Sequence, residues 1–302
     1  MTASLIDGKA IAAAILDEAA RDVAALREEG INPGLAAVLV GDDPASHVYV
    51  RNKIKACGRV GVDSRVFTLP SSSTHRDLLD LVHSLNREDA FHGILVQLPL
   101  PPHLDPFPII EALDPAKDVD GLHPTNMGLL AVGRPGFVPA TPAGILRMLL
   151  HLGVDPDGKT VVICGRSNIV GKPLGLLLSQ EVEHAANSTI ILCHTHTHDI
   201  GSLMRKGDIL VIATGDPQWV KAEMVRPGAV VIDVGINRVS DASAKRGYRL
   251  VGDVDFEEVK EVASMITPVP GGVGPATVAM LVHNTVRAAR RGSPASRPAA
   301  LS

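Results

Sequence analysis

Residues 161–175, VVICGRSNIVGKPLG, join an apolar segment to a glycine turn and a proline-containing helix start. A buried strand that passes through such a turn into a helix presents free backbone N–H groups and the positive end of the helix dipole at one point, which suits a phosphate. Dinucleotide-binding turns usually carry G-x-G-x-x-G here, whereas this turn carries Arg166-Ser167-Asn168. The stretch predicts either an unusual phosphate-binding turn or an ordinary strand-to-helix connection.

The next apolar strand, at 189–193, favours the phosphate-binding interpretation and NADP over NAD. NAD-binding units usually end this strand with an acidic residue that binds the ribose 2′-hydroxyl. Here HTHTH (194–198) follows the strand, and the first carboxylate is Asp199. Arg166 and this cluster could accept a 2′-phosphate instead. Alternating histidines could also indicate a metal site, but without a carboxylate partner we predict no metal.

Strands alternate with helical segments along nearly the whole chain, which is typical of parallel sheets with crossover helices. A proline- and glycine-rich passage after residue 114 separates two such series. We therefore predict an α/β fold of two lobes, an N-terminal catalytic domain and a Rossmann-like NADP-binding domain, with a cleft between them. The expected strands are 35–41, 62–69, one within 91–102, 160–164, 189–193, 208–212 and 229–233, and the expected helices are 11–26, 45–61, 74–86, 143–153, 173–180, 199–205 and 278–289.

Composition bounds the class of protein. The 302 residues suffice for about two domains, and 45% hydrophobic with 21% charged residues is typical of a soluble globular chain. A net charge of -4 and 3% aromatic residues give no general attraction to nucleic acid or to an anionic membrane. The chain has three cysteines without a C-x-x-C pair, no signal-peptide core and no run of about 18 apolar residues. We expect a cytoplasmic protein with a disordered tail at 291–302.

Several polar residues of the first lobe could converge on a ligand. Tyr49 and Lys53 lie four apart and share one face of a helix. Gln97 ends an apolar strand, and Asp118 and Asp120 lie where the chain leaves the lobe. Taken singly, Tyr49 and Lys53 could be an exposed aromatic–lysine pair, and Asp118 and Asp120 could belong to a hydrated turn. Together they offer general acid/base chemistry, because a lysine beside a neutral amide and away from water releases its proton more readily.

The motifs of both lobes, taken in order, match a known family from about residue 4 to 288. The sequence resembles bifunctional methylenetetrahydrofolate dehydrogenase/methenyltetrahydrofolate cyclohydrolase. The resemblance implies oxidation of 5,10-methylenetetrahydrofolate by NADP and hydrolysis of the methenyl product to 10-formyltetrahydrofolate. The motifs that carry it are SHVYVRNKIKACG, GILVQLPLP, PAKDVDG, ATPAGI, VVICGRSNIVGKP, VIDVGINR, VGDV and TPVPGGVGPATVAML.

The resemblance also implies roles for residues. Lys53 would be the essential acid/base of the hydrolytic step, tuned by Gln97; Tyr49 would orient Lys53 and the folate ring, and Asp120 would hold the pterin edge. The folate-binding residues would be Tyr49, Val50, Arg51, Asn52, Lys53, Val96, Gln97, Leu98, Asp120, Pro270, Gly271, Gly272, Val273 and Gly274. The predicted cofactor-binding residues are Gly165, Arg166, Ser167, His194, Thr195 and Ile236.

The same resemblance predicts the domain limits and the assembly. The C-terminal helix would fold back onto the first lobe, so the catalytic domain would comprise 1–121 with 275–290, and the NADP-binding domain 140–272. A homodimer formed by the second lobes is expected, with tetrahydrofolate one-carbon derivatives as ligands. Three alternatives stay open: another NADP-dependent dehydrogenase with a similar second domain, a non-catalytic folate- or nucleotide-binding regulator, and a protein with only one of the two activities.

Overall fold

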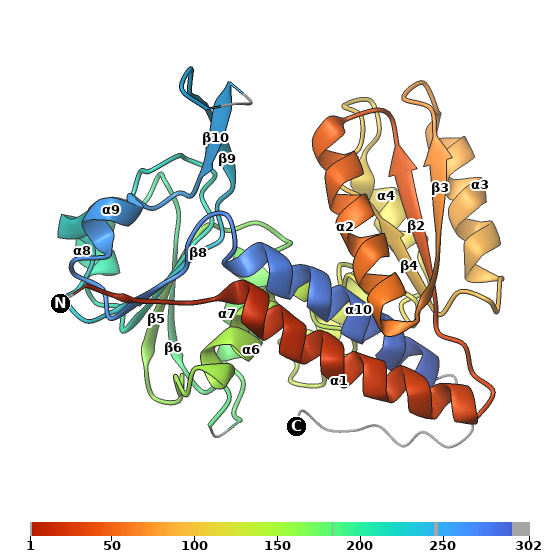
Figure 1. The fold of residues 1–302 in the computed structure, drawn as a ribbon, viewed down its shortest axis with the longest axis horizontal. Helices are drawn as coiled ribbons and strands as arrows, with labels where there is room; N and C mark the ends of the chain where they lie inside the picture. The colour runs from red at the N-terminus through yellow and green to blue at the C-terminus, as the bar shows by residue number, and fades with distance from the viewer. Residues whose placement is uncertain (1, 183, 245–246, 292–302) are drawn as a thin grey trace. The chain divides into compact units, whose positions relative to one another are not determined.

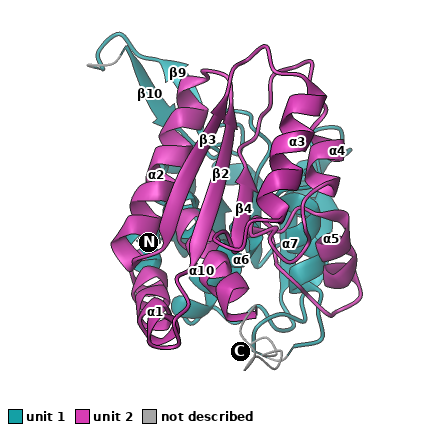
Figure 2. Cartoon of the chain, turned by 90° about the vertical axis from the view of Figure 1, so that its right-hand side faces the viewer, with its two compact units in different colours: residues 1–12, 141–277 teal, residues 13–140, 278–302 magenta. Residues whose placement is uncertain are grey.

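The computed structural model describes residues 2–182, 184–244 and 247–291, and the chain divides into two compact units. Unit 1 comprises residues 1–12 and 141–277, and unit 2 comprises residues 13–140 and 278–302 (Figures 1 and 2). Each unit contains its own parallel sheet, so the predicted α/β architecture is confirmed.

Unit 2 contains the three-stranded sheet β3-β2-β4. The central strand β2 (Gly34–Val40) pairs in parallel with β3 (Asp63–Leu69) and β4 (Gly93–Val96). Helices α3 (His75–Asn86) and α4 (Pro106–Glu111) pack on one face, and α2 (Pro44–Val60) lies on the other (Figure 1). All seven residues of β2 are buried, because helices cover both of its faces.

Unit 1 contains the six-stranded sheet β1-β11-β8-β7-β5-β6, whose strands are all parallel. Helices α6 and α7 lie on one face of this sheet, and α8 and α9 pack on the other (Figure 1). The bounds are β1 (Ser4–Leu5), α6 (Ala140–His151), β5 (Thr160–Cys164), α7 (Gly171–Leu178), β6 (Thr189–Cys193), α8 (Ile200–Met204), β7 (Ile209–Ile212), β8 (Val230–Asp233), α9 (Phe256–Val259) and β11 (Met265–Ile266).

The strand order of unit 1 creates one place suited to a ligand. Strand β6 lies on one side of β5, and β7 and β8 lie on the other, so the direction of the connections reverses between β5 and β7. In open parallel sheets, ligands bind outside the carboxyl ends of the strands at such a reversal. Gly165 follows β5 and Ala213 follows β7, so these residues mark that place.

Every helix and strand expected from the sequence is present, with bounds shifted by a few residues. One boundary is wrong in an informative way: residues 273–277 were expected in a loop, but they form the first turn of α10 (Val273–Arg291). Pro275 is compatible with this, because an N–H in the first helical turn needs no intrahelical acceptor. Helix α10 also includes Arg291, the first residue of the predicted tail; residues 292–302 lie outside the described residues.

The sequence did not reveal the short elements. These are β1 and β11, the antiparallel pair β9 (Asn237–Ser240) and β10 (Tyr248–Val251), and α4, α5 (Pro124–Ala131), α9 and the 3-10 helix η1 (Ala222–Met224). Across the described part of the chain, no helix combines the length and the apolar character needed to cross a membrane. Helix α1 (Gly8–Glu28) is the longest described helix.

Candidate active site

Helix α2 places Lys53 among core residues. The carboxylate of Asp43 accepts the N–H of Ser46 (2.8 Å) at the start of the helix, and Gly61 ends it with a positive φ of 87°. One side of α2 is buried, and Lys53, only 9% exposed, belongs to it. This buried stripe consists of Ser46, Val50, Lys53, Cys57 and Val60.

Lys53 meets Gln97 inside unit 2. The Lys53 ammonium Nζ donates to Gln97 Oε1 at 3.1 Å, and Gln97 is 8% exposed. Gln97 follows β4 directly; its backbone N–H donates to Val38 O (2.9 Å) and its side-chain Nε2 donates to Leu98 O (2.5 Å). These two bonds fix the amide with its oxygen toward the lysine. The structure thus brings together the amine and the amide that the sequence singled out.

The neighbours of Lys53 on the buried stripe of α2 carry no charge near pH 7. Val50 and Val96 are 3% and 5% exposed. Burial raises the pKa of the Cys57 thiol to about 12, so this neighbour of Lys53 on the buried stripe stays neutral near pH 7. The buried amine of Lys53 is thus held by a neutral amide and has uncharged neighbours on the same face of α2.

The other predicted residues of α2 lie nearer the surface. Tyr49, one helical turn before Lys53, is 40% exposed, so its ring is available to a ligand. Arg51 and Asn52 are exposed and lie off the buried stripe, whereas Leu98 is half-buried beside Gln97. The structure therefore joins Lys53 to Gln97 and places Tyr49 one helical turn before Lys53, whereas Arg51 and Asn52 lie on the exposed part of α2.

The loop that carries Asp120 is held on both sides. The Val119 carbonyl accepts Asn284 Nδ2 of α10 at 2.9 Å. Gly121 has φ +75°, and a Cβ there would lie 2.6 Å from the Pro139 nitrogen, so only glycine fits without strain. Asp120 is half-buried between these two fixed neighbours. A carboxylate held this way can offer both oxygens to a ligand edge with N–H donors.

Asp118 anchors the same loop from the interior. It is 1% exposed, and its Oδ2 accepts the N–H of His123 and Nδ2 of Asn126, both at 2.8 Å. Burial raises the pKa of Asp118. The sequence interpretation gave no part to Asn126 or Asn284; a polar residue within the apolar run of the last helix was the available signal for Asn284.

In unit 1, two glycines form the turn after β5. A Cβ at Gly165 (φ +129°) would lie 2.2 Å from Ala213 O, and a Cβ at Gly171 would lie 1.9 Å from Gly165 O. Backbone therefore packs directly on backbone where α7 begins, and Gly165 with Gly171 takes the place of the missing G-x-G-x-x-G. The sequence interpretation did not identify Gly171. Arg166 and Ser167 are exposed between the two glycines.

The histidine cluster does not continue strand β6. The strand ends at Cys193, and a turn follows in which Thr197 N donates to His194 O (2.7 Å) and His196 N donates to His194 Nδ1 (3.2 Å). The three histidines therefore do not alternate on one strand face. Partial burial, then the charge of Arg166, lowers the pKa of His194. Within the described residues, no group of three or more His, Cys, Asp or Glu residues is placed to hold a metal ion.

Two further predicted segments meet in unit 1. Ile236 follows β8 and is 43% exposed, and a Cβ at Gly274 would lie 3.9 Å from Ile236 Cδ1. Pro270 is exposed and Gly271 has φ +114°, while a Cβ at Gly272 would lie 2.7 Å from Thr267 Cβ. The predicted cofactor residue Ile236 is thus a neighbour of the predicted folate segment 270–274. Thr195 is exposed in the turn after β6.

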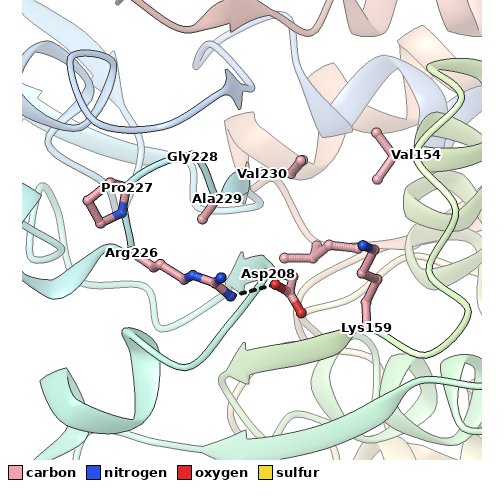
Figure 3. A pocket seen from close by; sticks show the side chains of 9 residues that line it. Val154, Lys159, Asp208, Arg226, Pro227, Gly228, Ala229 and Val230 are labelled. Atoms are coloured by element: carbon pink, nitrogen blue, oxygen red, sulfur yellow. Dashed lines mark hydrogen bonds and ion pairs between the residues drawn. The ribbon is translucent and has the colours of Figure 1, made fainter.

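A hollow of about 220 Å³ lies elsewhere in unit 1, at the amino-terminal ends of β5, β7 and β8 (Figure 3). Its lining includes Lys159 and the ion pair between Arg226 Nη1 and Asp208 Oδ1 (2.6 Å). None of the predicted site residues lines it. It belongs to the opposite edge of the sheet from Gly165.

Both halves of the chain match models of one protein family. Residues 6–120 match the tetrahydrofolate dehydrogenase/cyclohydrolase catalytic domain, and residues 139–293 match the NAD(P)-binding domain of the same family. The chain belongs to the tetrahydrofolate dehydrogenase/cyclohydrolase family. The bifunctional protein FolD of Acetivibrio thermocellus is 48% identical over 290 residues, which cover 96% of this chain and 98% of that protein.

Solved structures of the family have the same fold. The bifunctional enzyme FolD of Campylobacter jejuni superposes with a TM-score of 0.89 at 45% identity, covering 95% of this chain and 99% of that one. The methylenetetrahydrofolate dehydrogenase-cyclohydrolase of Trypanosoma brucei, complexed with NADP and an inhibitor, gives a TM-score of 0.91 at 42% identity, covering 98% and 100%. The family resemblance stated from the motifs is therefore confirmed.

The two glycines of α7 supply a matched test of the turn. We predict that Gly171→Ala lowers the free energy of unfolding by about 1–3 kcal/mol, because its Cβ would overlap the Gly165 carbonyl. The same substitution should weaken NADP binding. Gly175→Ala is the control, since its Cβ would lie 3.5 Å from Ile190 Cγ2, an ordinary contact, and alanine favours a helix by about 1 kcal/mol. Urea unfolding and calorimetric titration with NADP measure both effects; equal behaviour of the two variants would contradict the assignment.

Proposed function

We propose that this chain oxidises 5,10-methylenetetrahydrofolate with NADP+ and hydrolyses the resulting 5,10-methenyltetrahydrofolate to 10-formyltetrahydrofolate. The observation that carries the proposal is the buried contact between Lys53 Nζ and Gln97 Oε1, in a chain that matches both domains of the family. The contact supplies the proton-transfer group that hydrolysis needs, and the NAD(P)-binding domain supplies the place for the oxidant.

The hydrolytic step uses Lys53 as its acid/base. Water adds to the methenyl carbon and loses a proton, which the neutral amine of Lys53 accepts at Nζ. The same proton then passes to N5 as the bond between N5 and the one-carbon unit breaks, and the remaining hydroxyl proton is released to solvent as the C=O bond forms, which leaves the formyl group on N10. Gln97 supports this exchange because its neutral amide oxygen holds the amine in place in either protonation state.

We assign folate recognition to further groups by the family pattern. Asp120 accepts two N–H bonds from the edge of the pterin, Tyr49 covers the flat ring, and the segment 270–274 lets an extended ligand approach its backbone closely. Val50, Val96 and Leu98 supply apolar contacts, with Arg51 and Asn52 at the margin of the site. These assignments follow the family pattern position by position, and the fixed loop around Asp120 supports them.

The turn after β5 fits a dinucleotide. Helix α7 begins at this turn, and the side chains of Arg166, Ser167, His194 and Thr195, in this turn and in the turn after β6, carry hydrogen-bond donors. We assign the 2′-phosphate to Arg166 and His194. A phosphate dianion beside the His194 imidazole would raise its lowered pKa again. Ile236 contacts the nicotinamide half. When bound, the nicotinamide accepts a hydride from the one-carbon bridge, so no side chain has to take it.

Domain limits and assembly form part of the same proposal. The proposed catalytic domain comprises 1–121 with 275–290, and the proposed NADP-binding domain comprises 140–272; β1, within the first of these ranges, pairs with β11 in the sheet of unit 1, so the opening residues are grouped with that unit in the structure. The protein acts in the cytoplasm as a homodimer formed by its NADP-binding domains. A net charge of -4 and an aromatic content of 3% support a protein that binds neither nucleic acid nor membrane.

Lys53→Met tests the hydrolytic assignment. We predict that it lowers the rate of methenyltetrahydrofolate hydrolysis by about 10²–10⁴-fold, because the general acid/base is lost, while the circular dichroism of the fold persists. Lys55→Met is the matched control, because Lys55 is exposed on the same helix. Decay of methenyl absorbance measures the rate; a Lys53→Met protein that hydrolyses at the rate of the control would refute the role of Lys53.

Arg166→Ala tests the cofactor assignment. A charge-assisted bond to the 2′-phosphate is worth about 1.5–3 kcal/mol, so the ratio of kcat/KM with NADP to that with NAD should fall by about ten-fold or more. Arg226→Ala, in the hollow at the opposite edge of the sheet, should leave the ratio unchanged. Cofactor reduction followed by absorbance gives both values. An Arg166→Ala enzyme with the wild-type preference would exclude Arg166 as the phosphate ligand.

A further inference from the structure

Two buried carboxyl groups of unit 1 have no part in the function proposed above. Asp233 ends β8 and Asp253 follows β10, and they are 3% and 0% exposed. Removing a carboxylate from water costs free energy that hydrogen bonds must offset. Apolar residues would fill the same space at lower cost, so the arrangement of these two groups calls for a further explanation.

The side chain of Asp253 joins two loops. Its Oδ2 accepts the N–H groups of Thr214 (2.7 Å) and Gly215 (2.9 Å) in the loop after β7, together with the Thr214 hydroxyl (3.2 Å). Its Oδ1 accepts Nδ2 of Asn237 (2.7 Å), at the start of β9. Each oxygen serves a different loop, so the carboxylate sets the spacing between them.

Asp233 holds the backbone from which Asp253 projects. Asp233 Oδ1 accepts the N–H of Asp253 (3.1 Å) and of Gly235 (3.0 Å), and Oδ2 accepts the N–H of Val254 (2.9 Å). Burial, with the nearby Asp253 charge adding to it, raises the pKa of Asp233 to about 7.

Two glycines make room for the two carboxyl groups reciprocally. A Cβ at Gly235 would lie 2.1 Å from Asp253 Oδ1, and a Cβ at Gly252 would lie 1.8 Å from Asp233 Oδ2. The segments 233–235 and 252–253 thus fit one another through a carboxyl group on each side. Any side chain at either glycine would displace the carboxyl group that serves the loops.

The joined loops lie where the nicotinamide half of a dinucleotide would pass. The proposed adenosine end, at Arg166 and His194, follows β5 and β6. In the sheet order, β7 and β8 continue on the side of β5 away from β6. An extended dinucleotide that crosses Gly165 therefore reaches the ends of β7 and β8, where Ile236 stands in the loop that Asp253 holds.

We propose that Asp253 is a positioning residue for hydride transfer, which holds the loops 213–215 and 235–237 at the spacing that the nicotinamide ring requires, with Asp233 fixing Asp253. The inference rests on the proposed function. Asp253 touches neither substrate nor cofactor; it acts through Thr214, Gly215 and Asn237.

Asp253→Asn tests the proposal, because it keeps the size of the side chain and replaces one acceptor oxygen with an NH2 group that faces an N–H donor. We expect the dehydrogenase kcat to fall at least about ten-fold more than the hydrolysis rate of supplied methenyltetrahydrofolate. The Kd of 2′,5′-ADP, which probes the adenosine end alone, should stay within about two-fold. The control is Asp255→Asn, whose carboxylate binds Lys221 Nζ (2.7 Å) instead.

Asn237→Ala is the second variant, because its half-buried amide can be removed without emptying the core. We expect it to shift the ratio of dehydrogenase to hydrolysis activity in the same direction as Asp253→Asn. If Asp253→Asn does not fold, Asn237→Ala decides the question. A ratio that stays at the value of Asp255→Asn, with both activities falling together, would overturn the positioning role. Wild-type protein without NADP-dependent oxidation would instead overturn the proposed function itself.

Discussion

The hydrolytic chemistry proposed for this chain depends on one buried hydrogen bond, from the ammonium of Lys53 to the amide oxygen of Gln97. A lysine on the buried stripe of α2 is costly, since long charged side chains normally extend to water. The neighbours on that stripe are apolar or, like Cys57, neutral at pH 7. The polar partner of the amine within the described residues is the Gln97 amide, which carries no charge. This contact holds the amine at a fixed place inside unit 2, where the proposed function assigns it the acid/base role.

In unit 1, by contrast, the loops that carry the predicted site residues are held by close contacts of backbone with backbone or with carboxyl groups. Gly165 packs against Ala213, Gly171 packs against Gly165, and Gly235 accommodates Asp253. These contacts lie beyond the carboxyl ends of parallel strands, the end of a sheet at which α/β folds bind their ligands. Gln97 occupies the equivalent place in unit 2, directly after β4. Each unit thus has a predicted site residue directly after a buried strand, Gln97 after β4 and Gly165 after β5.

Much of this was predictable from the sequence, because its signals are local. Buried strands appear as apolar runs, and the spacing of Tyr49 and Lys53 follows from helical periodicity. The place of Gln97 follows from its position after β4. The two-residue strands β1 and β11 were not predictable, since pairing with neighbouring strands defines them rather than any local pattern. The Asp233–Asp253 pair was also missed, because it depends on a fit between segments that meet only in the folded unit.

The most direct measurement follows both reactions in one cuvette, with methylenetetrahydrofolate and NADP+ as the only reactants and two wavelengths recorded. The account predicts that NADPH accumulates while methenyl absorbance rises and then decays at a rate proportional to enzyme concentration. Methenyl product that accumulates with NADPH and decays only at the spontaneous rate would contradict the central role assigned to the buried amine.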